Sequence, residues 1–557
     1  MSAATYHVAV TTAPAPSTPV DPPAAPESAG ALPSSSRRTG PASIVSDAQR
    51  ARLREQLVPP FRDGGWRGWF GPLAVTLLAG VLRFWKLGQP HAFVFDETYY
   101  AKDAFSLLRY RYEQQFVDGA DKKILAGNLD VFKADPSFVV HPPLGKWIIA
   151  SGEQLFGMNP FGWRFAVAVL GTLSVLVLAR VVRRMTRSTL IGTLAGLLLA
   201  IEGLHVVMSR TALLDLPLSF FVLLGFAAIV MDRDRTRAKV AQRLDDFHDQ
   251  RTGPGLGFRP WLVVAGIALG AACACKWNGL WYLVAFGALA VFWNVSLRRL
   301  VGVRHPWVGA AARDALPAFL FMVPVAVAVY VASWWGWLST TGGYLRDWAD
   351  TNPGGFWSFV PGPLRALWEY HRQAYEFHVT LDSPHDYMSH PAGWLVLARP
   401  VSFFYESPKQ GQPGCDVATC AREVLALGNP VLWWGGIVAL LVMVWLAVSR
   451  LDWRAGATLV AVGAGLLPWY HYSNRTIFSF YAVVFAPFLV MAVALMLSWV
   501  LGPPDASSLR RTLGATGVGM FLAVALVVFA ALWPVLTAGV IPYQQWWDRL
   551  LNFAFWV

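Results

Sequence analysis

Two adjacent acids, Asp96 and Glu97, stand in the segment HAFVFDETYYAKDAFSLLRY at 91–110. A carboxylate can take the proton of a hydroxyl nucleophile, so this pair could supply the general base of a transfer reaction. The residues from Thr98 to Tyr112 have the spacing of an amphipathic helix. Because acids just before a helix can also simply cap its N-terminus, the local pattern leaves catalysis and capping open.

Four basic residues, each at one end of a hydrophobic run, are candidates for binding a phosphate: Arg164, Arg210, Lys276 and Arg475. A guanidinium or ammonium group at such a position can bind a lipid phosphate or orient a carboxylate, and Arg164 is our candidate for both roles. It can equally be an interface anchor whose charge reaches the headgroups. Clustered together, the four would form a cationic site for a phosphate leaving group.

Four further polar residues are candidates for the same site. His141 precedes two prolines in HPPLGK, a stiff turn that is also an ordinary way to begin a helix. Glu202 lies inside a hydrophobic run, where an ionisable side chain is a functional candidate. Asp215 is close enough to Arg210 in the sequence to form a structural ion pair, and His390 belongs to a later group of His and Asp residues.

The sequence pattern favours neither a metal nor a cofactor. The spacing of the His and Asp residues between 370 and 391 matches no standard metal-ligand pattern, so we expect no metal site. No glycine-rich nucleotide-binding loop is found, and we expect no cofactor. Cys415 and Cys420 lie in the same polar segment, where they can form a disulfide in an oxidising compartment or stay free thiols.

The composition is that of a membrane protein. Of 557 residues, 55% are hydrophobic and only 14% are charged, whereas soluble proteins carry about 25% charged residues. The net charge of +12 comes from arginines beside hydrophobic runs, which is typical of topology signals rather than of a nucleic-acid surface. We therefore expect contact with membrane lipids and no nucleic-acid partner.

Eleven hydrophobic segments are predicted to cross the membrane as helices, which makes the chain an all-α polytopic membrane protein. They lie at 67–86, 161–182, 189–208, 212–231, 261–276, 279–297, 314–337, 431–449, 455–470, 476–499 and 513–537. The Lys- and Arg-rich connections all fall on one side, and the positive-inside rule places that side in the cytoplasm. The N-terminus is then cytoplasmic and the C-terminus extracytoplasmic.

Two long connections, at 87–160 and 338–430, are expected on the outer face of the cell membrane. The candidate residues fall in these loops or at outer span ends, so we expect the chemistry on the extracytoplasmic face. Residues 63–557 would form one multi-span domain. Residues 1–62 begin with an Ala-, Pro-, Ser- and Thr-rich stretch and are predicted to be a disordered cytoplasmic tail.

Five segments carry a resemblance to a known family. The sequence resembles the protein O-mannosyltransferases, specifically the actinobacterial branch that uses polyprenyl-phosphate-mannose. The resemblance covers about 62–557, and its motifs are FVFDETYYA at 93–101, HPPLGKW at 141–147, WRFAVAVLGTL at 163–173, SRTALLDLPLSFF at 209–221 and CKWNGLW at 275–281.

This resemblance implies a GT-C type glycosyltransferase fold with eleven spans, an inside N-terminus and an outside C-terminus. It also implies transfer of mannose from the lipid phosphate to Ser or Thr hydroxyls of secreted proteins, with inversion at the anomeric carbon. The family's acid pair corresponds to Asp96 and Glu97, and its important arginine near the second span to Arg164. Eukaryotic members insert a β-trefoil domain into the second long loop, and the loop at 338–430 is too short for one.

Our hypothesis from the sequence gives each candidate a role. Asp96 acts as general base on the acceptor hydroxyl, and Glu97 orients Arg164 or the acceptor. The donor phosphate lies near Arg164, Lys276 and Arg475, with Arg210 as a further candidate. Acceptor proteins would enter from outside under the second loop, during export through the Sec pathway.

Two alternative functions follow from the same residues. Related lipid-dependent transferases that modify a glycolipid or cell-wall glycan also contain the acid pair, whereas SRTALLD favours a protein acceptor. A transporter should place its ionisable residues near the bilayer midplane in broken helices. Here these residues gather at outer span ends, which favours an enzyme.

Overall fold

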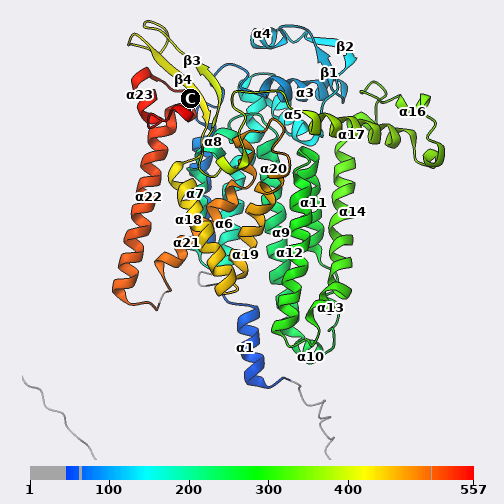
Figure 1. Cartoon of the computed structure of the whole chain (residues 1–557), viewed down its shortest axis with the longest axis vertical. Coiled ribbons are helices and arrows are strands. Elements are labelled where there is room, and N and C mark those ends of the chain that lie inside the picture. Colours follow the sequence, from blue (N-terminus) through cyan, green and yellow to red (C-terminus); the bar gives the residue numbers. More distant parts are fainter. Residues whose placement is uncertain (1–44, 62–64, 504, 557) are drawn as a thin grey trace, which may run out of the picture. The chain divides into compact units, whose positions relative to one another are not determined.

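The computed structural model describes residues 45–61, 65–503 and 505–556. Long helices lying side by side form the body of the part 45–557 (Figure 1). A helix overlaps each of the eleven hydrophobic segments. These helices are α2 (Arg67–Phe84), α6 (Pro160–Thr186), α7 (Thr189–Ala200), α9 (Asp215–Gln242), α11 (Pro260–Cys275), α12 (Gly279–Leu300), α14 (Leu316–Ser333), α18 (Pro430–Ser449), α19 (Trp453–Leu466), α21 (Ala486–Leu501) and α22 (Ser508–Leu536).

Six of the helical stretches in the described residues are long and apolar enough to cross a membrane: α6, α9, α12, α18, α22 and the run Pro306–Ser333 that contains α14. A seventh span results if α7 and α8 (Gly203–Ser209), which meet at a 66° bend, count as one. Helices α11 and α21 are apolar but have 16 residues each. The protein is therefore a multi-pass membrane protein.

Local sequence signals set several helix starts. Pro160, Pro260 and Pro430 each occupy the first turn of their helix, where a missing N–H costs nothing. The side chains of Asn159 and Asn429 accept hydrogen bonds from the first backbone N–H groups of α6 and α18. These capped starts of α6 and α18 lie next to the two long loops.

The two long loops lie at one end of the helix bundle, together with the C-terminus (Figure 1). The first contains α3 (Glu97–Tyr110), β1 (Gln114–Phe116), α4 (Ala120–Leu125), β2 (Phe132–Pro136) and α5 (Leu144–Phe156). The second contains α16 (Trp348–Thr351), η2 (Gly355–Phe359), α17 (Gly362–Thr380), η3 (Pro391–Gly393), β3 (Val401–Glu406) and β4 (Cys420–Ala426). Helix α3 confirms the amphipathic helix expected after the acid pair.

Short elements complete the two ends. Near the long loops lie α15 (Trp335–Leu338), α20 (Pro468–His471), η4 (Ser479–Val484), β5 (Val540–Pro542), α23 (Tyr543–Arg549) and η5 (Ala554–Trp556). At the opposite end lie α10 (Leu244–Phe247), α13 (Pro306–Ala310) and the π-helical turn η1 (Ala311–Ala315). The π turn joins α13 to α14 without interrupting the helical run.

The expectation of an all-α protein is wrong in the loops. Strands β1 and β2 pair antiparallel, and β3, β4 and β5 form a second antiparallel sheet in that order. The second sheet joins residues more than 100 positions apart, since Arg422 pairs with Val540. Such pairing cannot be seen in a local hydrophobic pattern.

Cys415 and Cys420 form a disulfide in the segment that joins β3 to β4. This outcome decides between the two alternatives that the sequence left open. Cys273 and Cys275, on α11, are free thiols.

Part of the predicted disordered tail, residues 1–62, is helical. Residues 1–44 lie outside the described residues, but α1 (Asp47–Leu57) is a helix capped by Ser46. Arg50 pairs with Asp245 at 2.9 Å, and Leu57 packs against buried residues of the segment 240–247. The segment DAQRARLREQL combines good helix formers with an N-cap, so it folds once a surface is present to pack against.

Candidate functional site

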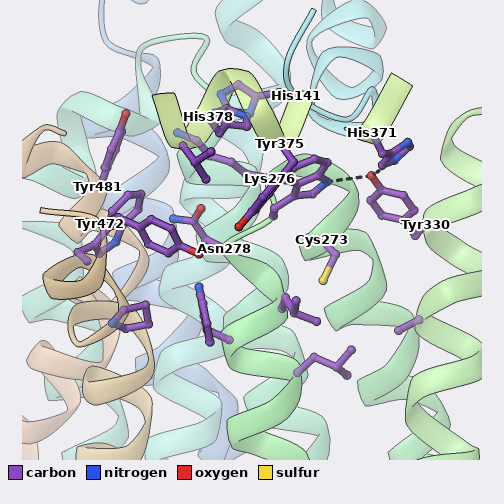
Figure 2. A pocket seen from close by; sticks show the side chains of 18 of the residues that line it. His141, Cys273, Lys276, Asn278, Tyr330, His371, Tyr375, His378, Tyr472 and Tyr481 are labelled. Carbon is purple, nitrogen blue, oxygen red and sulfur yellow. Dashed lines mark hydrogen bonds between the residues drawn. The ribbon is translucent and has the colours of Figure 1, made fainter. Parts of the chain in front are cut away.

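A cavity of about 470 Å³ lies where the ends of α11, α12, α14 and α20 meet α17 of the second loop. Its wall is mostly aromatic and aliphatic, with a few polar groups among them. Figure 2 shows Tyr481 and Tyr472 on one side, Tyr330 and His371 on the other, and His141 and His378 above. A largely apolar cavity with few polar groups is a common form of ligand site.

Asp96 occupies the N-cap position of α3, but its side chain makes no cap hydrogen bond. Among the described residues its carboxylate has neither a hydrogen-bond donor nor an ion-pair partner, and it is half-buried. Burial raises the pKa of the Asp96 carboxyl to about 6, while the Lys276 cation opposes this rise and the Asp215 carboxylate adds to it. A carboxylate of this pKa near neutral pH suits a general base better than a helix cap.

Glu97, the next residue, is completely buried. Its carboxylate accepts hydrogen bonds from the Arg164 Nε and Nη2 atoms at 2.8 and 2.7 Å. It also accepts from the backbone N–H groups of Val94 and Ala212, both at 2.9 Å. Glu97 therefore ties the first loop to α6 and to the turn before α9.

Arg164 uses all five of its N–H groups inside the protein. Besides Glu97, its Nη1 donates to the carbonyls of Leu87 and Pro90 at 3.2 and 3.1 Å, and its Nη2 to Ala92 at 2.9 Å. No N–H is left for a phosphate in this arrangement. The geometry favours a positioning role for Arg164 over a contact with the donor.

Phe95, which the sequence analysis passed over, sits directly before the base candidate in a left-handed backbone conformation with φ +50°. Its ring stacks on Phe403 of β3 at 4.9 Å between ring centroids. The rings of Phe478, Phe480 and His385 meet it edge-on. A left-handed non-glycine residue is strained, so this aromatic cage holds the turn that leads into Asp96 and Glu97.

Lys276 and Asp215 form the buried ion pair of the site. The Lys276 Nζ lies 2.9 and 3.1 Å from the two carboxylate oxygens of Asp215 and 4.3 Å from the centre of the Tyr481 ring. The expected pairing of Asp215 with Arg210 is therefore wrong. Helix α9 begins at Asp215, which carries its side chain toward α11, while Arg210 lies before the turn.

Arg210 caps the end of α2 instead of entering the cavity. Its Nη1 donates to the carbonyls of Leu82, Arg83 and Trp85 at 3.1, 2.8 and 2.7 Å. Carbonyl groups at a helix C-terminus lack partners within the helix, and a guanidinium satisfies three of them here. This arrangement gives Arg210 a structural role.

Arg475 lines the cavity, and its buried Nε has no partner among the described residues. His141 lines it as well and stacks on His378 with 5.0 Å between ring centroids. Burial lowers the pKa of His141 well below its ordinary value and that of His378 to about 4. Both imidazoles are therefore neutral near pH 7, and Arg475 and Lys276 are the cations that face the cavity.

Glu202 and His390 do not line the cavity. Glu202 caps the half-helix α8 by accepting from the N–H groups of Leu204 and His205, and it also accepts from Asn429 N and Trp433 Nε1. His390 caps the short turn η3 through its Nδ1 and lies on the surface. Neither residue is brought to the site.

The sequence analysis missed several aromatic and polar wall residues. The Trp277 Nε1 donates to the Tyr330 hydroxyl at 2.9 Å, and that hydroxyl lies 2.6 Å from His371 Nε2 (Figure 2). Aromatic residues at span ends are common interface anchors, so their types alone carried no site signal. Among the residues that the structure describes, no three His, Cys, Asp or Glu side chains converge as metal ligands do.

Comparison with known families agrees with this geometry. Residues 73–338 match the family model described as dolichyl-phosphate-mannose-protein mannosyltransferase. Residues 363–499 match the C-terminal four-span region of protein O-mannosyltransferases. The chain belongs to the protein O-mannosyltransferase family. The two matches together span more than half of the chain and include every candidate residue of the site.

Curated members of the family cover nearly the whole chain. The polyprenol-phosphate-mannose–protein mannosyltransferase of Mycolicibacterium smegmatis (strain MKD8) is 38% identical over 88% of this chain and 92% of its own length. The enzyme of the same name from Mycobacterium tuberculosis (strain H37Rv) is 38% identical over 88% and 91%. That of Corynebacterium glutamicum is 31% identical over 86% and 91%.

A solved structure shares the fold. The Saccharomyces cerevisiae protein O-mannosyltransferase Pmt1-Pmt2 complex, bound to the sugar donor, aligns with a TM-score of 0.67 at 16% identity. The alignment covers 93% of this chain and 96% of that one. The chain therefore has the helical GT-C fold that the sequence motifs implied.

Replacing Phe95 tests the strained turn before the acid pair. Phe95→Gly and Phe95→Ala both remove the ring, but only glycine adopts a positive φ without strain. We expect Phe95→Ala to be less stable than Phe95→Gly by about 1 kcal/mol in thermal unfolding of the purified protein. Equal stability of the two variants would show that the backbone conformation is not under strain.

Removing the Glu202 carboxylate should destabilise the bundle without acting on the site directly. Glu202→Ala leaves four buried donors unpaired, and we expect a loss of more than about 3 kcal/mol, seen as a lower midpoint of thermal unfolding followed by Trp fluorescence. His390→Ala is the control and should change stability by less than about 0.5 kcal/mol. Similar midpoints for the two variants would contradict the structural role of Glu202.

Proposed function

We propose that this chain transfers mannose from polyprenyl-phosphate-mannose to Ser or Thr hydroxyls of exported proteins. Membership of the family and the names of relatives that match nearly the whole chain support the reaction. The assignment rests on Asp96, whose carboxylate has no partner among the described residues and interacts electrostatically with Lys276 on the cavity wall. The relatives' names favour a protein acceptor over a glycolipid.

The proposed chemistry is a single displacement at the anomeric carbon. Asp96 accepts the proton of the acceptor hydroxyl as its oxygen forms a bond to that carbon. The bond from the carbon to the phosphate oxygen breaks, and the electron pair leaves with the polyprenyl phosphate. Attack from the face opposite the leaving group inverts the configuration.

The leaving phosphate gains negative charge, which the cavity cations would stabilise. An ammonium group has three N–H donors, and the two hydrogen bonds of Lys276 to Asp215 leave one for a phosphate oxygen. Arg475 has its guanidinium at the same wall. In this proposal Arg164 and Arg210 act by holding the loop and the end of α2.

The neutral histidines suit the sugar end of the donor. His141 has no hydrogen bond to any described residue, and as a neutral ring it carries one donor and one acceptor nitrogen. Sugar hydroxyls both donate and accept hydrogen bonds. We assign His141 to this subsite, and we propose that the reaction requires no cofactor besides the lipid-linked donor.

We further propose eleven spans, a cytoplasmic N-terminus and an active site on the extracytoplasmic face. The Arg-rich connections near 180–187, 298–313 and 510–511 support this orientation through the positive-inside rule. The disulfide in the second loop fits an oxidising compartment. Acceptors would then be modified during or after export through the Sec pathway.

Asp96→Asn should lower the transfer rate by about 10²- to 10⁴-fold, because the amide cannot accept the hydroxyl proton. The measurement is mannose transfer to a synthetic Ser/Thr-rich peptide by purified enzyme supplied with polyprenyl-phosphate-mannose. The wild-type rate should rise with pH through about 6 and then level off, since the base works only when ionised.

Asp118→Asn, an exposed acid of the same loop, is the matched control and should keep the wild-type rate and pH profile. Full activity of Asp96→Asn would overturn the assignment of the base. A wild-type rate that falls with rising pH through 6 would mean that the protonated acid is the active form.

Arg475→Gln should weaken transition-state binding by about 1.5–3 kcal/mol, or roughly a 10- to 150-fold fall in kcat/KM. The loss follows from removing one charged donor to the phosphate. Thermal stability should stay unchanged, because the Arg475 side chain forms no hydrogen bond with any described residue that the substitution would break. Arg372→Gln, on the exposed side of α17, is the control, and an equal loss in both variants would argue against a phosphate contact.

A further inference from the structure

A second cavity, of about 920 Å³, lies at the opposite ends of the helices. Helix α19 connects the two sites: Arg454 in its first turn lines the second cavity, and Pro468 just beyond its end lines the first. The end of α6, the start of α7, the ends of α18 and α21 and the start of α22 enclose the rest. The mannosyl-transfer site uses none of these residues.

The wall of this cavity is divided by polarity. Ile191, Met443, Leu446 and Leu495 form an aliphatic surface on α7, α18 and α21. Hydroxyl and charged groups stand at the helix ends, among them Ser188, Thr512 and three arginines. Trp499 lies between them and is half exposed, at the boundary where tryptophan indoles accumulate in membranes. This division matches a molecule with an acyl chain and a polar headgroup.

The arginines differ in how far their donors are already used. Arg510 donates to the carbonyls of Val500 and Trp499 at the end of α21. Arg454 is paired through its Nε and Nη2 with Asp452, also in the wall, and this leaves its Nη1. The side chain of Arg511 has no partner within the described part of the chain. Arg511 and the Nη1 of Arg454 are therefore available to an anion.

We propose that this cavity binds an anionic phospholipid, with the phosphate on Arg454 and Arg511 and an acyl chain along the aliphatic wall. Basic pockets between helices at a membrane end bind such headgroups. Arginines at this end also serve as topology signals, but that role needs neither a cavity nor an aliphatic wall beside them. The lipid matches both parts of the site, whereas free phosphate matches only the arginines.

The experiment compares lipid retention by the purified full-length protein. Native mass spectrometry after incubation with phosphatidylglycerol or phosphatidylcholine measures how much of each stays bound. We expect wild-type protein to retain phosphatidylglycerol selectively. Arg454→Gln/Arg511→Gln should retain it about thirtyfold more weakly, since each arginine near a headgroup contributes about a factor of five.

Arg299→Gln/Arg313→Gln is the matched control, because both arginines are exposed at the same end and outside the cavity. It should retain phosphatidylglycerol as the wild type does. Ala515→Trp fills the cavity without changing charge and should also release the lipid. This variant keeps the test valid if the double arginine variant folds poorly.

Three outcomes would overturn the proposal. Equal loss of lipid in the cavity and control variants would mean that only the net charge of this end matters. Equal retention of phosphatidylcholine would show that the arginines select nothing. Inorganic phosphate that raises thermal stability as much as phosphatidylglycerol does would assign the site to a free ion.

Discussion

The buried ion pair between Glu97 and Arg164 is the constraint on which the site depends. Both side chains are almost completely excluded from solvent, and every donor of the arginine is satisfied. Burying two charges is costly, and it is tolerated only where hydrogen bonds compensate both partners, as they do here. The pair ties the first outer loop to α6, and through Ala212 to the turn before α9. The loop therefore takes one position relative to the bundle.

This anchor also explains how two neighbouring acids can do different work. The carboxylate of Glu97 accepts hydrogen bonds only from the protein itself, so its role is structural. Asp96, one residue earlier, is left without a partner, and the charge of Lys276, a residue of the cavity wall directly after α11, acts on it. The strained conformation at Phe95 lies directly before the pair, and rings from β3 and η4 pack against the Phe95 ring. The proposed base is thus held by the first loop, the second loop and the bundle together.

Much of the fold could be predicted from the sequence, because hydrophobic length and the positions of Pro, Asn and Arg act locally. The pairings could not. Asp215 lies five positions from Arg210 in the sequence, yet it forms its ion pair with Lys276, 61 positions further along. The direction of α9 determines which of the two cations its side chain can reach. Strands β4 and β5 and the helix α1 likewise depend on partners far along the chain.

The candidate site shows the same division. Asp96, Lys276, Arg475 and His141 were named from the sequence, and the structure places the last three on the wall of one cavity. Arg164 and Glu97 were also named from the sequence, but their saturation by internal hydrogen bonds appears only in three dimensions. From the sequence, Arg210 and Glu202 could not be told from functional ions, but the structure shows that both cap helices. Phe95 gave no signal, since only its backbone angle and its ring contacts distinguish it.

The acidity of Asp96 has a consequence for the end of the catalytic cycle. In the proposed reaction the donor is a phosphodiester with one negative charge, and the product is a phosphomonoester that can carry two. Neutralising Asp96 offsets the second charge, so the total charge of the site is the same before and after transfer. The second pKa of a phosphomonoester is about 6, close to the pKa of about 6 for Asp96. Both groups therefore gain and lose a proton in the same pH range. Once the products have left, Asp96 would lose its proton to solvent and be ready for the next acceptor.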